Sequence, residues 1–352
     1  MDYKECIFSL SECVGLSGFE YEVGKHIKTY LENYTNEVTI DPLGNVRGTI
    51  RCGKPNAKRV LLDAHMDEIG LMVQGIDKNG FLRFCALGGI DPRILPGALV
   101  RVCGREVLFG VVSVKPPHIQ TQEEEKKALS LSDLVIDVGF SCERVKELVH
   151  VGDAVALYGP PVSLLGETIV GKSFDDRAGI AAILYAVDKV SKSIQNIDIE
   201  IMASTQEEVG GRGAQTGSYL AAADVAIVVD TGHAKTPDAS EDRTFEMGGG
   251  VMIGAGPNMH PEITKRLMTI AKEKEIPHQI EVMGGDTGTN AWVMQVVRSG
   301  IGCGLLSIPL RYMHTTIESI SMKDFYATGD LIAAFLQEYD EAKGLESGEV
   351  NR

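Results

Sequence analysis

The chain has 352 residues, of which 44% are hydrophobic and 24% are charged. This length allows one large domain and a smaller one, each with its own core. The formal net charge is −15, from 49 acidic and 34 basic residues. Because so acidic a surface repels nucleic acid and anionic membranes, we expect neither as a partner.

The cysteines number seven, and no CxxC pair occurs. An odd number of separate cysteines predicts neither a disulfide framework nor a zinc knuckle and favours reduced thiols. The first ten residues lack a basic region followed by an apolar run, so no signal peptide is predicted. The longest apolar run, near residues 178–187, is about half as long as a membrane span. We therefore expect a cytoplasmic protein.

The first part of the chain, up to about residue 66, has the pattern of helix, turn and strand, and the apolar run Arg59–Ala64 is the predicted strand. From about residue 70 to 163 the pattern changes. Short β-rich runs, such as Leu99–Cys103, Val107–Val114 and Ala154–Tyr158, alternate with glycine and proline, which is typical of small barrels and sandwiches. The charged run Gln122–Lys127 is predicted to be a solvated loop.

After residue 163, predicted helices alternate with predicted buried strands. The helices are Ala178–Val190, Glu262–Lys274 and Lys323–Tyr339, and the strands include Ile199–Ala203 and Val225–Val229. This alternation favours an α/β fold with a mostly parallel sheet. We predict a catalytic α/β domain formed by residues 1–68 and 165–352, into which residues 69–164 are inserted as a β-rich, barrel-like domain.

Four predicted buried strands, which begin at residues 59, 199, 225 and 304, are each followed by polar residues. Ligands bind at the carboxyl edge of the strands in open α/β sheets. Four such strand ends on one edge would bring their polar side chains together. These residues are His65, Glu207, Glu208, Asp230 and His314.

A fifth segment, Ser173–Gly179, precedes the alanine-rich helix and contains Asp175 and Asp176. One Asp at a helix start is commonly a cap, but two exceed what capping requires. Because a carboxylate has two oxygens, one Asp could bridge two cations while the other caps the helix.

The charges of these residues favour two metal ions. Asp175, Glu208 and Asp230 supply three negative charges, and His65 and His314 supply neutral nitrogens. Two divalent ions and a bound hydroxide would balance them, whereas one ion would not. Mixed imidazole and carboxylate ligands suit zinc, cobalt or manganese. Any one of these residues is more often structural, so the prediction rests on their joint placement.

Four segments of the chain resemble the signature segments of the tetrahedral and glutamyl aminopeptidases. They are His65–Gly70, Phe174–Arg177, Gln206–Gly210 and Arg311–His314, and the resemblance runs in order through nearly the whole chain. It implies an enzyme that removes amino-terminal residues from peptides with two divalent metal ions per subunit, zinc or cobalt. It also implies that the inserted domain mediates dimerisation and that the dimers assemble into a dodecamer.

The resemblance also implies the metal ligands. One metal would be held by His65, Asp175 and Asp230, and the other by Asp175, Glu208 and His314, with Asp175 as the bridge.

Two further residues receive roles from the same resemblance. Glu207 would be the general base for a metal-bound hydroxide nucleophile, and Asp67 would orient His65. The segment Gly284–Asn290 departs from the family in the order of its polar residues. We expect it to line the substrate cleft.

Three alternatives stay open at this point. Gly166–Ser173 fits the P-loop pattern GxxxxGK[ST] of nucleotide hydrolases, but residues 168–170 are β-branched where a phosphate loop needs a flexible backbone. A glycosidase could use Glu207 or Glu208 with an Asp, and relatives of this family have been labelled cellulases, but both histidines would lack a role. A non-catalytic metal-binding protein would not need a free base such as Glu207.

Overall fold

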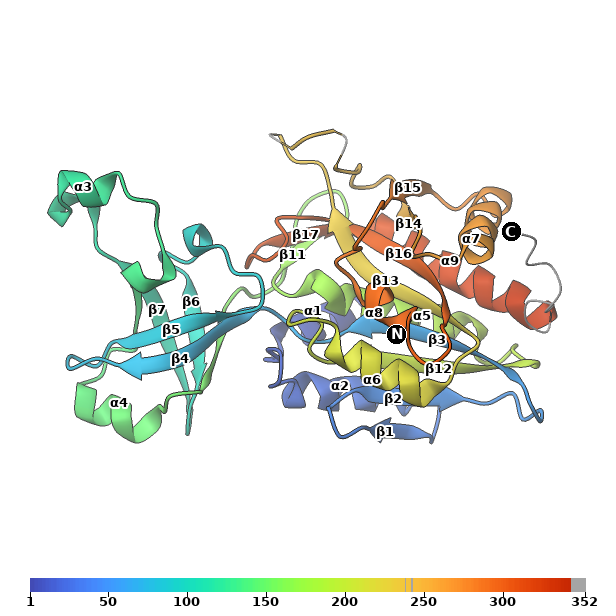
Figure 1. The fold of residues 1–352 in the computed structure, drawn as a ribbon, viewed down its shortest axis with the longest axis horizontal. Helices are drawn as coiled ribbons and strands as arrows, with labels where there is room; N and C mark the ends of the chain where they lie inside the picture. The colour runs from blue at the N-terminus through green and yellow to red at the C-terminus, as the bar shows by residue number, and fades with distance from the viewer. Residues whose placement is uncertain (238, 242, 343–352) are drawn as a thin grey trace.

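The computed structural model describes residues 1–237, 239–241 and 243–342. It contains two parts, a β-barrel and a larger α/β part, which lie next to each other in Figure 1. None of the helices in these residues has the length and apolar content that crossing a membrane requires.

The α/β part is built on one large sheet. In spatial order its strands are β1 (Val38–Ile40), β2 (Val46–Ile50), β12 (Ile197–Ser204), β3 (Lys58–His65), β13 (Val225–His233), β16 (Gly302–Arg311), β17 (Glu318–Ser321), β11 (Thr168–Gly171) and β10 (Val162–Ser163). In addition, β14 (Val251–Ala255) pairs with β16 and with β15 (His278–Val282). The four central strands β12, β3, β13 and β16 are parallel, whereas the pairs toward both edges are antiparallel.

Helices cover both faces of this sheet. On one face α1 (Tyr3–Glu12), α2 (Tyr21–Leu31), α5 (Phe174–Val190), α7 (Pro261–Glu273) and α9 (Met322–Glu341) contribute to the main hydrophobic core. On the other face α6 (Arg212–Ala221) and α8 (Asn290–Met294) form a second core. Along β3, Val60 and Leu62 enter the first core and Leu61 enters the second. Burial on both faces explains why the central strands are continuous apolar runs.

The barrel lies between β3 and β10 in the chain and has its own core. Its closed strand order is β4 (Gly70–Ile76), β5 (Leu82–Leu87), β8 (Leu134–Asp137), β7 (Val107–Val114), β6 (Leu99–Cys103) and β9 (Ala154–Leu157). Short helices connect these strands: η1 (Pro92–Ile94), η2 (Pro117–Ile119), α3 (Gln122–Glu125), η3 (Leu131–Asp133) and α4 (Cys142–Leu148). Side chains of β7 alternate between the solvent and the barrel interior, as one-sided burial requires.

The predicted fold class, a mostly parallel α/β fold with an inserted β-barrel, is confirmed. The limits 1–68, 69–164 and 165–352 stay a prediction, and the chain has rejoined the large sheet by β10. One local expectation was wrong, because the charged run at 122–127 contains the short helix α3 rather than only a loop.

The P-loop alternative was also wrong. Its residues 168–171 form β11, which pairs along its length with β17, so this backbone is not free to surround a phosphate. Lys172 is buried, and its Nζ donates hydrogen bonds to Glu68 Oε2 at 2.5 Å and to the Cys13 carbonyl at 3.2 Å. Arg177 lies on the other side of Glu68, 3.2 Å from Oε1. The three side chains form a buried ion network that anchors the start of α5.

The ion network makes Lys172 a stability determinant. We expect Lys172→Ala to lower the free energy of unfolding by about 3 kcal/mol, because it removes one partner from a buried ion pair. Urea denaturation followed by circular dichroism measures this change. The matched control is Lys78→Ala at an exposed lysine. Equal unfolding curves for both variants would contradict the proposed importance of the network.

Candidate metal centre

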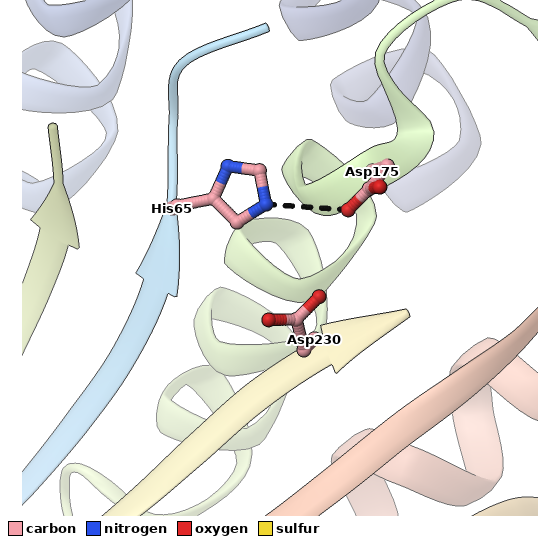
Figure 2. A group of neighbouring side chains, drawn as sticks. All are labelled: His65, Asp175 and Asp230. Atoms are coloured by element: carbon pink, nitrogen blue, oxygen red, sulfur yellow. Dashed lines mark hydrogen bonds and ion pairs between the residues drawn. The ribbon is translucent and has the colours of Figure 1, made fainter. Parts of the chain in front are cut away.

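Two groups of potential metal ligands meet at the carboxyl end of the central strands. One group comprises His65, Asp175 and Asp230, and the other comprises Asp175, Glu208 and His314. Within each group the ligand atoms lie within 4.8 Å of one another. Figure 2 shows the first group, in which His65 and Asp230 project from neighbouring strands toward Asp175 at the start of α5.

Asp175 lies between the two groups. Its Oδ1 is 3.2 Å from His65 Nε2, and its Oδ2 is 3.5 Å from His314 Nε2. His314 Nε2 is also 3.2 Å from Glu208 Oε1. The two oxygens of one carboxylate thus face opposite groups, which is the arrangement that a bridging ligand needs.

Strand register places His65 and Asp230 at the same level. In the β3–β13 ladder, Asp63 pairs with Val228, and each ligand lies two residues further along its strand. Asp230 was expected at the end of its strand, but β13 continues to His233 because it stays paired with β16. Asp230 is therefore held inside a strand with ladder partners on one side.

Asp67 fixes the turn that carries the two glutamates. Its fully buried carboxylate accepts hydrogen bonds from the backbone N–H of Glu207 at 2.9 Å and of Glu208 at 3.2 Å. Ser17 Oγ donates a third at 2.6 Å. Asp67 also contacts His65, whose Nδ1 lies 3.1 Å from the Asp67 carbonyl oxygen and 3.6 Å from Oδ1. One residue thus touches both the imidazole and the backbone of the glutamate pair.

Glu318, in β17, is a residue of the site that the sequence analysis did not identify. Its Oε1 accepts a hydrogen bond from the His314 N–H at 2.9 Å, and its Oε2 accepts from the N–H groups of Phe174 at 2.7 Å and Asp175 at 3.2 Å. Burial and repulsion by Asp175 raise the pKa of Glu318 to about 8. The only signal in the sequence was an acidic residue at the start of the short strand that follows His314.

A backbone group of the barrel part also contacts a residue of the centre. His314 Nδ1 lies 2.9 Å from the carbonyl oxygen of Gly89, and since a carbonyl only accepts, Nδ1 donates this hydrogen bond. Nε2 is then the ring nitrogen that faces Asp175 and Glu208, and once deprotonated it is the nitrogen that could bind a cation beside them. Gly89 has little room for a side chain, because a Cβ would lie 2.8 Å from His314 Nδ1.

The electrostatics of the centre favour bound cations. Burial raises the pKa of Glu207 to about 7, and burial together with repulsion by Asp175 raises the pKa of Asp230. Burial alone would lower the pKa of His314, but its hydrogen bonds with Asp175 and Glu208 outweigh this effect and raise it to about 11. Burial likewise opposes the protonation of His65, but its hydrogen bond with Asp175 outweighs burial and raises the pKa of the imidazole. Carboxylates so crowded gain from positive charge, and mixed oxygen and nitrogen donors fit divalent transition metals.

A cavity of about 240 Å³ opens onto both groups. Glu207 lines it but belongs to neither group of ligands. Thr287, Gly288 and Thr289 line it too, so part of the glycine-rich segment lies where the sequence analysis expected it.

Known proteins are similar to the chain over nearly its full length. The sequence profile of the M42 glutamyl aminopeptidase family matches residues 44–331. A lysyl aminopeptidase from Pyrococcus furiosus is 34% identical over 339 residues, which cover 95% of this chain and 96% of that protein.

Solved structures agree with the sequence comparison. An aminopeptidase from the archaeon Desulfurococcus kamchatkensis superposes with a TM-score of 0.90 at 32% identity and covers 99% of each chain. The TET1 peptidase of Pyrococcus horikoshii, which can assemble into a tetrahedron or a large octahedral shell, gives a TM-score of 0.83 at 28% identity, covering 95% of this chain and 99% of that one.

The fold and the ligand groups define a metal-dependent peptidase. The chain belongs to the M42 glutamyl aminopeptidase family. The predicted family and the predicted enzyme class, a hydrolase of peptide bonds, are thereby confirmed. Neither a nucleotide hydrolase nor a glycosidase agrees with this membership.

The contact between Gly89 and His314 leads to a prediction. We expect Gly89→Ala to displace the imidazole and to weaken binding of one metal equivalent, because the new Cβ would lie too close to Nδ1. Metal analysis after dialysis should show a loss on the order of 10- to 100-fold in affinity, as for other changes to the support of a ligand. Gly75→Ala, at a barrel glycine without a positive φ whose Cβ would meet no atom closer than 4.0 Å, is the matched control. Retention of full metal affinity in Gly89→Ala would contradict the role of this contact.

Proposed function

We propose that the chain is an aminopeptidase that uses two divalent metal ions to hydrolyse the amino-terminal residue from peptides. The observation that carries the proposal is the pair of ligand groups that share Asp175. Membership of the M42 family supports the choice of substrate. The small size of the cavity, about 240 Å³, also suits one terminal residue better than the middle of an extended chain.

The metal ligands in this proposal are those of the two groups. His65, Asp175 and Asp230 hold one ion, and Asp175, Glu208 and His314 hold the other, with zinc or cobalt as the metals that suit these donors. When bound, two such ions supply Lewis acidity, which polarises the scissile carbonyl and lowers the pKa of water. Glu318 and the Gly89 carbonyl keep the protein ligands in position.

Glu207 is the general base in this mechanism. It lines the cavity beside the ligands, and its backbone is tied to Asp67, which limits the positions that its carboxylate can reach. It takes a proton from the attacking water as the carbon–oxygen bond forms. It then returns the proton to the nitrogen as the carbon–nitrogen bond breaks, which releases a neutral amine. Asp67 is the positioning residue for both Glu207 and His65.

We also propose that the chain forms homo-oligomers through its barrel. Leu99, Val107, Phe109 and Val111 are exposed to solvent on the paired strands β6 and β7. Phe109 leaves 60% of its surface exposed. An apolar group of this kind on an antiparallel ladder is typical of an interface. Assembly of dimers into a dodecamer and the cytoplasmic location stay predictions.

The oligomer proposal is tested at Phe109. We expect Phe109→Ser to shift the mass of the particles toward smaller species, because it removes the largest exposed apolar side chain from this surface. Light scattering at several protein concentrations measures the mass. Leu165→Ser, at a leucine that is 96% exposed in the α/β part, is the control. If the control changes the mass and Phe109→Ser does not, the interface lies outside the barrel.

The mechanism is tested at the adjacent glutamates. Glu207→Gln retains the size of the side chain but removes the base, so we expect two metal equivalents per chain and a kcat lower by a factor of about 10²–10⁴. Glu208→Ala removes a ligand, so one equivalent should be lost together with the activity. Metal analysis and kcat on aminoacyl amides, before and after chelation, measure both effects.

Two outcomes of this experiment would contradict the proposal. Loss of metal from Glu207→Gln and not from Glu208→Ala would exchange the two roles. Full activity of the wild-type protein after complete removal of metal would exclude a metal-dependent mechanism.

A further inference from the structure

A polar network of three side chains lies buried in the second core, close to the metal centre. Asp63 precedes His65 by two residues on β3, and its Oδ2 accepts a hydrogen bond from Asn290 Nδ2 at 2.8 Å. The same Nδ2 donates to Ser204 Oγ, also at 2.8 Å. None of the three residues is more than 1% exposed. We call Asp63, Ser204 and Asn290 the amide network, because the amide of Asn290 connects the other two.

Each member of the amide network belongs to an element that carries part of the site. Asp63 shares β3 with the ligand His65. Ser204 is the ladder partner of His65 and ends β12, the strand that leads to the two glutamates. Asn290 is the first residue of α8 and follows Thr289, which lines the cavity. The network therefore joins a ligand strand, the strand before the glutamates and the cavity wall.

Folding stability does not account for the amide network. The ladder partners of Asp63 are Met202 and Val228, and both belong to the apolar second core. Among the residues that the structure describes, Asp63 Oδ1 and Asn290 Oδ1 have no hydrogen-bond partner. Partly satisfied polar groups are costly to bury, and replacing a buried polar pair by apolar side chains of similar shape is often neutral or stabilising. A network that costs stability next to a site indicates a role in the site.

The cavity wall is the part of the site that gains most from a fixed support. Thr287, Gly288 and Thr289 line the cavity, and the Oγ1 atoms of the two threonines lie 2.9 Å apart. The wall belongs to the glycine-rich segment 284–290, in which Gly288 has a φ of 62°. Since glycines leave the backbone much conformational freedom, the position of the threonines depends on how the end of the segment is held. The amide of Asn290 holds that end against β3 and β12.

We propose that Asp63 and Asn290 are positioning residues, which hold the cavity wall at residues 287–289 in place against the metal centre. Neither belongs to a ligand group or lines the cavity, so both act through the wall. The wall in turn keeps a bound substrate aligned with the metal centre, where a displacement of about 1 Å can cost about 10²-fold in rate. The inference rests on the proposed aminopeptidase function and adds two residues to its machinery.

The test removes the hydrogen bond without leaving a cavity or an unpaired carboxylate. In the double variant Asp63→Leu/Asn290→Leu both partners become apolar, and Ser204 keeps its hydrogen bond to the Ala64 carbonyl at 3.4 Å. We expect this variant to retain the wild-type Tm or exceed it, and to retain its metal content. Its kcat/KM should fall by about 10- to 100-fold on the aminoacyl amide that the wild-type protein cleaves best. Asn290→Leu alone should lower the Tm, because Asp63 stays buried without its amide partner.

Hydrogen exchange followed by mass spectrometry gives a readout that is independent of turnover. In the double variant we expect faster exchange in segment 284–290 and wild-type exchange in the sheet. The control is Asp340→Leu, because Asp340 accepts hydrogen bonds from the N–H groups of residues 195–197 and lies outside the cavity lining. This control should lower the Tm and leave kcat/KM unchanged at a temperature at which every variant is folded.

The outcomes separate this inference from the function on which it rests. Wild-type kcat/KM in the double variant would overturn the proposal, whatever happens to the Tm. A fall in kcat/KM with unchanged exchange in segment 284–290, or with faster exchange throughout the chain, would also overturn it, because the effect would then not come from the wall. If the wild-type protein cleaves no aminoacyl amide, the proposed function fails, whereas unchanged local exchange with normal cleavage by the wild-type protein counts against the positioning role alone.

Discussion

The concentration of negative charge at the carboxyl edge of the sheet is the constraint on which the rest of this structure depends. Asp175 and Asp230, which are buried, converge there with the partly buried Glu207 and Glu208. Burying carboxylates together is unfavourable unless hydrogen bonds or cations compensate them. The fold supplies imidazoles and backbone N–H groups, and metal ions would supply the remaining positive charge.

The two buried carboxylates next to the ligands, Asp67 and Glu318, have a structural role that differs from the role of the ligands. Asp67 and Glu318 accept hydrogen bonds from protein groups, among them the backbone N–H groups of Glu207, Glu208, Asp175 and His314. Each therefore uses its charge to fix the backbone next to a functional side chain. This explains how loops that leave strands of different length can present their side chains to a common centre.

The barrel and the α/β part are connected through the site as well as through the chain. The Gly89 carbonyl selects the tautomer of His314, although this residue lies 225 positions further along the sequence. On the other side of the centre, the buried network of Glu68, Lys172 and Arg177 ties the start of α5 to the segment after β3. Removing the barrel would thus alter the environment of one ligand even though the barrel supplies no ligand itself.

Local sequence determined which residues could form the centre. Buried strands are recognisable as apolar runs, and the polar residues that interrupt or follow them, such as His65, Glu207 and Asp230, stand out because burial there is costly without a partner. The same reasoning predicted the parallel sheet and the separate β-rich insert. The tertiary structure alone decided the supporting contacts, because they join residues that are far apart in the sequence. The position of Asp230 inside β13, the carboxylate of Glu318 and the contact of Gly89 with His314 depend on strand register and on which segments become neighbours, and no local pattern encodes either.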